Sequence, residues 1–241
     1  MYDIESAYMR FLGRCHIEHA ALKAVLFDMD GVLFDSMKNH TLAWYETISG
    51  MGIPCVREEF YQYEGATGKG TIDHIYQRTY GRDATDHEVE YIYGEKSRRF
   101  NELGEAEPMP GAKEMLTEVV RRGLIPVLVT GSGQRSLLDR LNRVYPGVFA
   151  PERMVTAFDV QRGKPDPEPY LKGLEKAGVK PFEAMVVENA PLGVRAGVVA
   201  RIFTVAVNTG PIPDEQLRRA GANLLFPDMQ SLAEHFCNLK F

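Results

Sequence analysis

The chain has 241 residues, a formal net charge of −5 and a hydrophobic fraction of 44%. This composition excludes collagen-like, disordered and small disulfide-scaffold proteins, and a chain of this size buries roughly 70% of its extended surface on folding. The net negative charge argues against a general affinity for nucleic acid or for an acidic membrane surface. We therefore expect a soluble protein that acts on small molecules.

The cysteines and apolar segments bear on the cellular compartment of the protein. The 3 cysteines are widely spaced and form no CxxC motif, which favours a reducing cytoplasm over a disulfide framework. Charged residues interrupt the first twenty positions, so no secretory signal is recognised, and the apolar runs are too short to cross a bilayer. We expect a cytoplasmic protein.

Short runs rich in Val, Ile, Leu and Phe recur along the chain with amphipathic segments between them. This pattern is typical of parallel strands that helices bury on both faces. The sequence therefore predicts an α/β fold with a Rossmann-like parallel sheet. The predicted strands cover 24–27, 125–129, 154–156, 184–187, 202–207 and 223–225, and amphipathic helices are predicted near the N-terminus and over 134–143.

Nearly a hundred residues separate the first two predicted strands. Residues 36–107 show helical periodicity around 42–46, 72–76 and 89–93, broken by glycines at 50–52 and 65–70. We interpret 36–107 as a helical cap inserted into a core made of 21–35 and 108–241, with 1–20 as an N-terminal extension. Ligands of open α/β sheets bind beyond the carboxyl ends of the strands, so this cap would cover the ligand crevice. The cap aromatics are interpreted as packing residues: Trp44, Tyr61, Tyr63, Tyr76, Tyr91 and Tyr93.

Polar side chains follow several predicted strands at the same edge of the sheet. Asp28 and Asp30 come directly after the first strand, where an ionised carboxylate needs a metal, a cation or hydrogen-bond donors. Thr130 ends the second strand, and the backbone amides of the following glycine-rich turn can bind an anion. Lys164 precedes a helix that begins with proline, and Glu188-Asn189 ends the fourth strand. Taken singly, each motif is more often a helix cap, a turn or a solvated charge than a functional site.

In this combination and order, the sequence resembles the haloacid dehalogenase superfamily of phosphotransferases, from about residue 22 to the C-terminus. The resemblance implies that Asp28 attacks phosphorus and forms an aspartyl phosphate, while Asp30 serves as general acid and then as base. It implies that Thr130 holds the phosphoryl oxygens with Gly131 and Ser132. A carboxylate that approaches a phosphate dianion meets repulsion of ~5 kcal/mol per charge pair. Lys164 and Mg²⁺ would offset that repulsion.

The resemblance also implies a set of Mg²⁺ ligands. These are the Asp28 carboxylate, the Asp30 backbone carbonyl and the Asn189 side chain, with Glu188 either ligating or in the outer shell. Relatives usually carry Asp in place of Asn189. The amide keeps a hard oxygen but removes one negative charge, so either Mg²⁺ binds more weakly or another acid compensates.

Residues 35–40 and Trp44 resemble the first linker and helix of the β-phosphoglucomutase-like subgroup. By that resemblance His40 is a cap residue of the active site, with an ordinary surface histidine as the alternative. Sugar phosphomutases of this kind carry lysine in place of Glu64 and arginine in place of Gly68, and these cations would bind a second phosphate. Glu64 is expected either to reach Mg²⁺ from the cap or to cap a helix. Lys96 is a candidate for contact with a distal phosphate.

These observations together predict a Mg²⁺-dependent phosphohydrolase for a small phosphorylated substrate, with inorganic pyrophosphate as the first candidate. A β-phosphoglucomutase is the second hypothesis, and a phosphate-binding module without catalysis is the third. Resemblance to the subgroup predicts a monomer.

Overall fold

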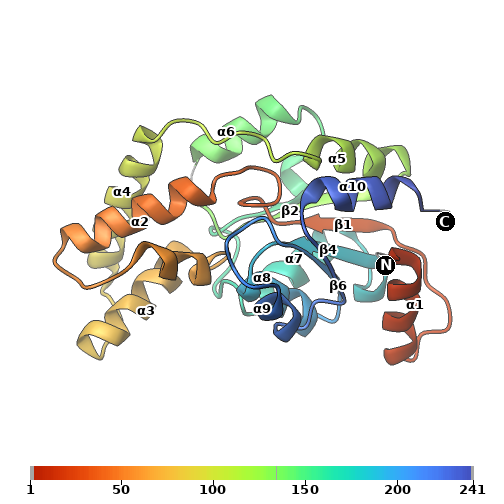
Figure 1. The fold of residues 1–241 in the computed structure, drawn as a ribbon, viewed down its shortest axis with the longest axis horizontal. Helices are drawn as coiled ribbons and strands as arrows, with labels where there is room; N and C mark the ends of the chain where they lie inside the picture. The colour runs from red at the N-terminus through yellow and green to blue at the C-terminus, as the bar shows by residue number, and fades with distance from the viewer. Residues whose placement is uncertain (1–2, 134, 240–241) are drawn as a thin grey trace.

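The computed structural model describes residues 3–133 and 135–239 (Figure 1). Its sheet has six parallel strands in the order β3-β2-β1-β4-β5-β6. The predicted α/β fold is confirmed, and each predicted strand is present with ends that differ by one residue at most. The strands are β1 (Ala24–Phe27), β2 (Ile125–Val129), β3 (Met154–Val155), β4 (Ala184–Glu188), β5 (Phe203–Val207) and β6 (Leu224–Phe226).

Helices cover both faces of this sheet, because alternate side chains of each strand point to opposite sides. In β1, Val25 and Phe27 belong to the apolar cluster of one face, and Ala24 and Leu26 to that of the other. The first face carries α1 (Ile4–Arg14), α5 (Ala112–Arg121), α6 (Arg135–Val144) and α10 (Met229–Cys237). The second carries α7 (Glu168–Ala177), α8 (Pro191–Val199) and α9 (Asp214–Arg219). The helix predicted over 134–143 corresponds to α6, and Gln134 lies outside the described residues.

The predicted N-terminal extension contains helix α1, which packs against the sheet. Asp3 caps the helix by accepting a hydrogen bond from the backbone N–H of Ser6. Tyr8 and Phe11 are buried, with ring centroids 5.4 and 5.7 Å from that of Phe203. The Tyr8 hydroxyl donates to the carbonyl of Phe182 over 2.5 Å. Helix α1 is therefore part of the apolar core of the sheet domain.

All the regular secondary structure between β1 and β2 is helical. It contains α2 (Met37–Gly50), α3 (Gly68–Tyr80), α4 (Asp86–Glu102) and the 3-10 helix η1 (Arg57–Tyr63), while η2 (Pro151–Arg153) and η3 (Pro181–Glu183) are short turns of the sheet domain. These cap helices bury a cluster of their own around Trp44, Ile48 and Ile72. Thr67 caps α3, so the glycine-rich break expected at 65–70 is shorter than predicted. Thr85 and Glu88 form a capping box that begins α4.

Two linkers join the cap to the sheet domain and run side by side. The backbone N–H of Asp35 donates to the carbonyl of Glu107 over 2.8 Å, and that of Met109 donates to the carbonyl of Leu33 over 2.9 Å. Figure 1 shows the cap helices α2, α3 and α4 gathered at one end of the sheet domain. Within the described residues, no helix is both long and apolar enough to span a membrane.

Candidate active site

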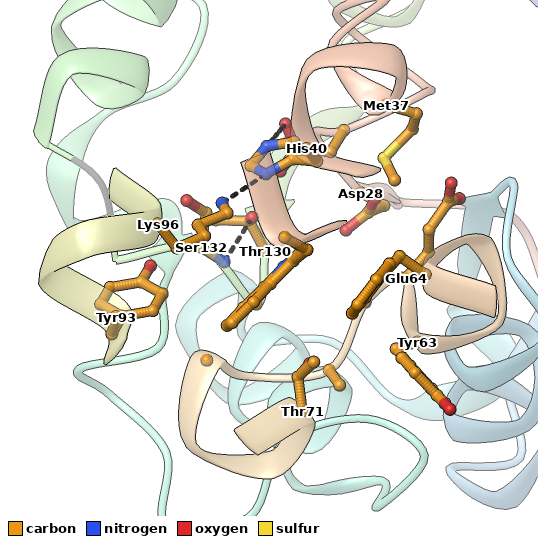
Figure 2. Close-up of a pocket in the computed structure, with 17 residues that line it drawn as sticks. Asp28, Met37, His40, Tyr63, Glu64, Thr71, Tyr93, Lys96, Thr130 and Ser132 are labelled. Atoms are coloured by element: carbon orange, nitrogen blue, oxygen red, sulfur yellow. Dashed lines mark hydrogen bonds and ion pairs between the residues drawn. The ribbon is translucent and has the colours of Figure 1, made fainter. Parts of the chain in front are cut away.

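The carboxyl ends of β1, β2 and β4 carry the predicted site residues to one place, because parallel strands end at the same edge of the sheet. A cavity of about 60 Å³ lies between this edge and the cap. Its lining includes Asp28, Asp30 and Thr130 from the sheet domain, and Figure 2 shows Glu64 and Lys96 of the cap around the same space. The cap therefore covers the site, as the sequence predicted.

Lys164 lies at the centre of this cluster and is fully buried. Its Nζ donates to Asp28 Oδ1 and to Glu188 Oε1, each over 2.6 Å, and to the carbonyl of Val129 over 3.0 Å. All three N–H bonds of the ammonium are thus engaged. The interpretation of Lys164 as a solvated surface charge is wrong, because the flanking carboxylates hold it in the interior.

Glu188 is completely buried, and both of its oxygens are occupied. Oε1 accepts from Lys164 and also from the Tyr170 hydroxyl over 2.7 Å. Oε2 accepts from the backbone N–H groups of Asn189 and Ala190, over 3.0 and 3.3 Å. A carboxylate has about four acceptor sites, so these bonds saturate it. Gly193 leaves the room that this requires, since a Cβ there would lie 1.7 Å from Oε1.

Asp28 is the carboxylate that faces both Lys164 and the cavity. Burial raises the pKa of Asp28 to about 7, although Lys164 acts in the opposite direction, and the negative charges of Glu188 and Asp30 raise it further. Additional positive charge beside Asp28 would therefore favour its ionised, nucleophilic form.

A chain of polar contacts leads from Asp30 into the cap. Asp30 Oδ1 accepts from Ser36 Oγ over 2.5 Å and lies 3.1 Å from His40 Nε2. Lys96 Nζ lies 2.6 Å from the other ring nitrogen of His40. Burial acts to raise the pKa of Asp30, but His40 and Ser36 outweigh it and hold that pKa below its usual value. His40 is buried, which excludes the alternative of an ordinary surface histidine.

Burial lowers the pKa of His40, and the charge of Lys96 lowers it further, so the imidazole is neutral at pH 7. Burial also lowers the pKa of Lys96, to about 7. A protonated lysine can only donate, so it donates to Nδ1 of His40 and leaves the ring proton on Nε2. In that state His40 is a hydrogen-bond donor to Asp30.

The turn after β2 approaches the cap closely. Thr130 Oγ1 accepts from the backbone N–H of Ser132 over 3.0 Å, which shapes the turn around the cavity (Figure 2). At Gly131 a Cβ would lie 2.5 Å from the carbonyl oxygen of Gly65, so only glycine permits this contact between turn and cap. The Tyr93 hydroxyl accepts from the backbone N–H of Gly133 over 3.3 Å. Tyr93 thus lines the cavity instead of only packing the cap, while Tyr91 is exposed.

Glu64 of the cap and Asn189 of the sheet domain meet directly. Asn189 Nδ2 donates to Glu64 Oε2 over 2.9 Å, and both side chains are buried. Glu64 Oε1 and Asn189 Oδ1 are also buried but have no hydrogen-bond partner among the described residues. Burial, together with Asp28 and Asp30, raises the pKa of Glu64 well above its usual value. These two unpartnered hard oxygens, one from the cap and one from the sheet domain, match the donor type that Mg²⁺ prefers.

Within the described residues, no group of three His, Cys, Asp or Glu side chains is arranged to hold a metal ion. The Mg²⁺ donors that the resemblance implies are of a different kind, because they include the side-chain amide of Asn189 and the backbone carbonyl of Asp30. Asp28 is also bonded to Lys164 in this structure.

Three residues of this site were not predicted as functional from the sequence: Ser36, Tyr93 and Tyr170. Ser36 directly precedes α2 and has the pattern of a helix cap. Tyr93 and Tyr170 occupy apolar helical positions, a signal that normally means core packing.

A family model described as haloacid dehalogenase-like hydrolase matches residues 22–201. The chain belongs to this family. Hexitol phosphatase A of Escherichia coli is 33% identical to it over 77% of this chain and 83% of that protein. A phosphorylated carbohydrates phosphatase of Thermotoga maritima is 31% identical over 75% of this chain and 82% of that protein.

The solved structure named "Putative beta-phosphoglucomutase from Bacteroides vulgatus" is 52% identical, with a TM-score of 0.92 over 96% of this chain and 94% of that one. The haloacid dehalogenase-like chain therefore belongs to the β-phosphoglucomutase-like subgroup, whose helical cap it shares. This membership makes it a phosphatase or phosphotransferase of the haloacid dehalogenase type.

Proposed function

We propose that this chain hydrolyses a small phosphorylated substrate through an aspartyl phosphate on Asp28. The observation that carries the proposal is the buried ammonium of Lys164, 2.6 Å from Asp28 Oδ1 at the edge of the cavity. This cation offsets the repulsion between the carboxylate and the incoming phosphoryl group. Thr130 and the amides of the turn after it hold the phosphoryl oxygens.

Asp30 acts in this proposal as the general acid and then as the base. Because its pKa lies below the usual value, Asp30 must first take up a proton, which it then passes to the leaving oxygen. The carboxylate that this leaves afterwards removes a proton from the attacking water. Ser36 and His40 bond to Oδ1 and fix the orientation of that carboxyl. Because Lys96 and His40 belong to the cap, the orientation of Asp30 depends on cap closure.

The same edge fits Mg²⁺. Asp28, the backbone carbonyl of Asp30, Asn189 and Glu64 would hold the ion, and the two unpartnered oxygens of Glu64 and Asn189 support this set. Glu188 belongs to the outer shell in this proposal, because hydrogen bonds already occupy both its oxygens. When bound, Mg²⁺ supplies positive charge at the transferring phosphoryl group.

A phosphorylated sugar or sugar alcohol is the favoured substrate class. Two relatives that are more than 30% identical are named as phosphatases of a hexitol and of phosphorylated carbohydrates. The cavity walls combine aromatic rings, such as Trp44, with the polar groups of Tyr93 and Lys96. The aromatic rings suit the C–H groups of a sugar, and the hydrogen-bonding groups suit its hydroxyls.

Inorganic pyrophosphate is the second candidate. The cavity of about 60 Å³ favours a compact substrate, and Lys96 is an ammonium on its wall that can contact a distal phosphate. A mutase needs a further phosphate site, and at Gly68 a Cβ would lie 2.3 Å from Cδ2 of Tyr93, which leaves no room for an arginine. A binding module without catalysis has no need of the paired Asp28 and Lys164.

Phosphate release from a panel of sugar phosphates, sugar-alcohol phosphates and pyrophosphate, with and without Mg²⁺, tests the proposal. We expect release that requires Mg²⁺ and is lost in Asp28→Asn but not in Asp86→Asn, an exposed cap residue. The most rapidly cleaved compound separates the two substrate candidates. Isomerisation of a hexose phosphate without net release would favour the mutase instead, and binding without turnover would favour the module.

A further inference from the structure

Tyr170 is a completely buried phenol beneath the catalytic cluster. It lies on α7, and its hydroxyl donates to Glu188 Oε1 over 2.7 Å. Lys164 Nζ donates to the same oxygen and lies 5.1 Å from the centroid of the tyrosine ring. Burial and the negative charge of Glu188 raise the pKa of Tyr170 well above its usual value, so the phenol keeps its proton.

Lys164 cannot contact a phosphoryl oxygen without giving up a bond that it already makes. Its three N–H groups are directed to Asp28, Glu188 and Val129. Asp28 must stay masked while it attacks phosphorus, and the Val129 carbonyl belongs to the fixed backbone of β2. The bond to Glu188 is therefore the one that Lys164 can exchange for a phosphoryl oxygen.

Breaking that bond would normally be unfavourable, because a buried carboxylate oxygen left without a hydrogen-bond donor is destabilising. Glu188 is protected against this by its other partners. Oε2 keeps the backbone N–H groups of Asn189 and Ala190, and Oε1 keeps the hydroxyl of Tyr170.

We propose that Tyr170 is a positioning residue for phosphoryl transfer: it keeps Glu188 Oε1 hydrogen-bonded while Lys164 turns from Glu188 to the phosphoryl group. Phenylalanine at this position would fill the same volume but lack the donor. The inference rests on the proposed function, since it concerns the Lys164 that binds the transferring group.

The test measures phosphoryl-mimic binding in Tyr170→Phe. Orthovanadate is titrated into the protein with saturating Mg²⁺ by calorimetry, and Mg²⁺ alone is titrated separately. Tyr8→Phe is the matched control, because Tyr8 is also a buried phenol that donates a single bond, to Phe182 and away from the site. Thermal melting of all three proteins checks that they remain folded.

We expect the Kd for vanadate to rise about fivefold or more in Tyr170→Phe, as expected for a buried oxygen left without its donor. The Kd for Mg²⁺ should change by less than about threefold, since the Tyr170 hydroxyl bonds Glu188, which is not one of the proposed ligands. Tyr8→Phe should alter neither value. With a cleaved substrate, kcat should fall more than KM rises.

Unchanged vanadate affinity in a folded Tyr170→Phe protein would overturn the role given to Tyr170, and so would an equal loss in Tyr8→Phe. A large loss of Mg²⁺ affinity would overturn it as well, because the tyrosine would then act through the metal. If the wild-type protein binds Mg²⁺ but no vanadate, the proposed phosphoryl site itself fails, and this result is distinct from the others.

Discussion

The Glu64 carboxylate of the cap accepts a hydrogen bond from the Asn189 amide of the sheet domain, with the two atoms 2.9 Å apart. This contact joins residues 125 positions apart at the edge where the phosphoryl group is expected. In the proposed Mg²⁺ site, Glu64 of the cap supplies the negative charge that Asn189 lacks. Metal binding and cap closure are thereby linked in the proposed mechanism.

The first prediction concerns Mg²⁺ affinity. Glu64→Gln removes a charge and an oxygen from the proposed ligand set, so the Kd for Mg²⁺ should rise about tenfold or more. Calorimetric titration of Mg²⁺ measures this without any substrate. Glu58→Gln, which changes an exposed carboxylate of η1, should leave the Kd unaltered. Equal affinities in Glu64→Gln and wild type would remove Glu64 from the metal site.

The second prediction concerns the contact between the cap and the turn after β2. In Gly131→Ala the new Cβ would lie 2.5 Å from the Gly65 carbonyl oxygen and 2.8 Å from that of Ala66, so the cap cannot close fully. We expect kcat/KM to fall by about tenfold or more, since misplacing catalytic groups by an ångström has effects of this order. The melting temperature should change little.

Gly94→Ala is the matched control for that substitution, because a Cβ at Gly94 of helix α4 meets no atom within 4 Å. Its activity should equal that of the wild type. If Gly131→Ala retains full activity, closure of the cap against this turn is not required for turnover.

The third prediction concerns the pH dependence of stability. Burial lowers the pKa of Lys96 from 10.5 to about 7, so between these values the unfolded chain binds a proton that the folded chain does not. This group therefore makes the wild-type protein more stable as the pH rises from 7 towards 10.5. Lys96→Met removes the effect.

Chemical denaturation at pH 7 and at about pH 9 measures this change in stability. The free energy of unfolding of wild type relative to Lys96→Met should rise by about 2 kcal/mol between pH 7 and about pH 9. In the control Lys113→Met, which changes an exposed lysine of α5, the free energy of unfolding should vary with pH as it does in the wild type. A constant difference between wild type and Lys96→Met would mean that Lys96 keeps its charge throughout this range.

The sheet and the helical cap were predictable from the sequence because their signals are local. Buried parallel strands are continuous apolar runs, and the cap helices repeat apolar residues at helical spacing. Asp28 and Thr130 were found because each directly follows a strand, and Lys164 because it lies in the loop between β3 and α7. The loops that follow parallel strands meet at one edge of the sheet. The packing of helix α1 on the sheet was not predicted, because an amphipathic pattern indicates a buried helix face but not the surface against which that face packs.

The role of Tyr170 and the saturation of Glu188 could not be predicted, because they depend on side-chain positions within the packed core. A buried tyrosine on a helix has the same pattern whether its hydroxyl bonds a backbone carbonyl, as in Tyr145, or a catalytic carboxylate. The meeting of Glu64 with Asn189 likewise requires the cap to be placed on the sheet domain. The pyrophosphate specificity, the cytoplasmic location and the monomeric state stay predictions.

Detection of the phosphorylated intermediate tests the central claim most directly. The enzyme is mixed with a general phosphoryl donor such as acetyl phosphate or p-nitrophenyl phosphate in Mg²⁺, quenched with acid and reduced with borohydride, which converts an aspartyl phosphate to homoserine. Peptide mass spectrometry should find homoserine at position 28 in the wild-type protein and only unmodified asparagine there in Asp28→Asn. Turnover of the donor with unmodified Asp28, or with the modification at another carboxylate, would contradict the assignment of Asp28 as the nucleophile.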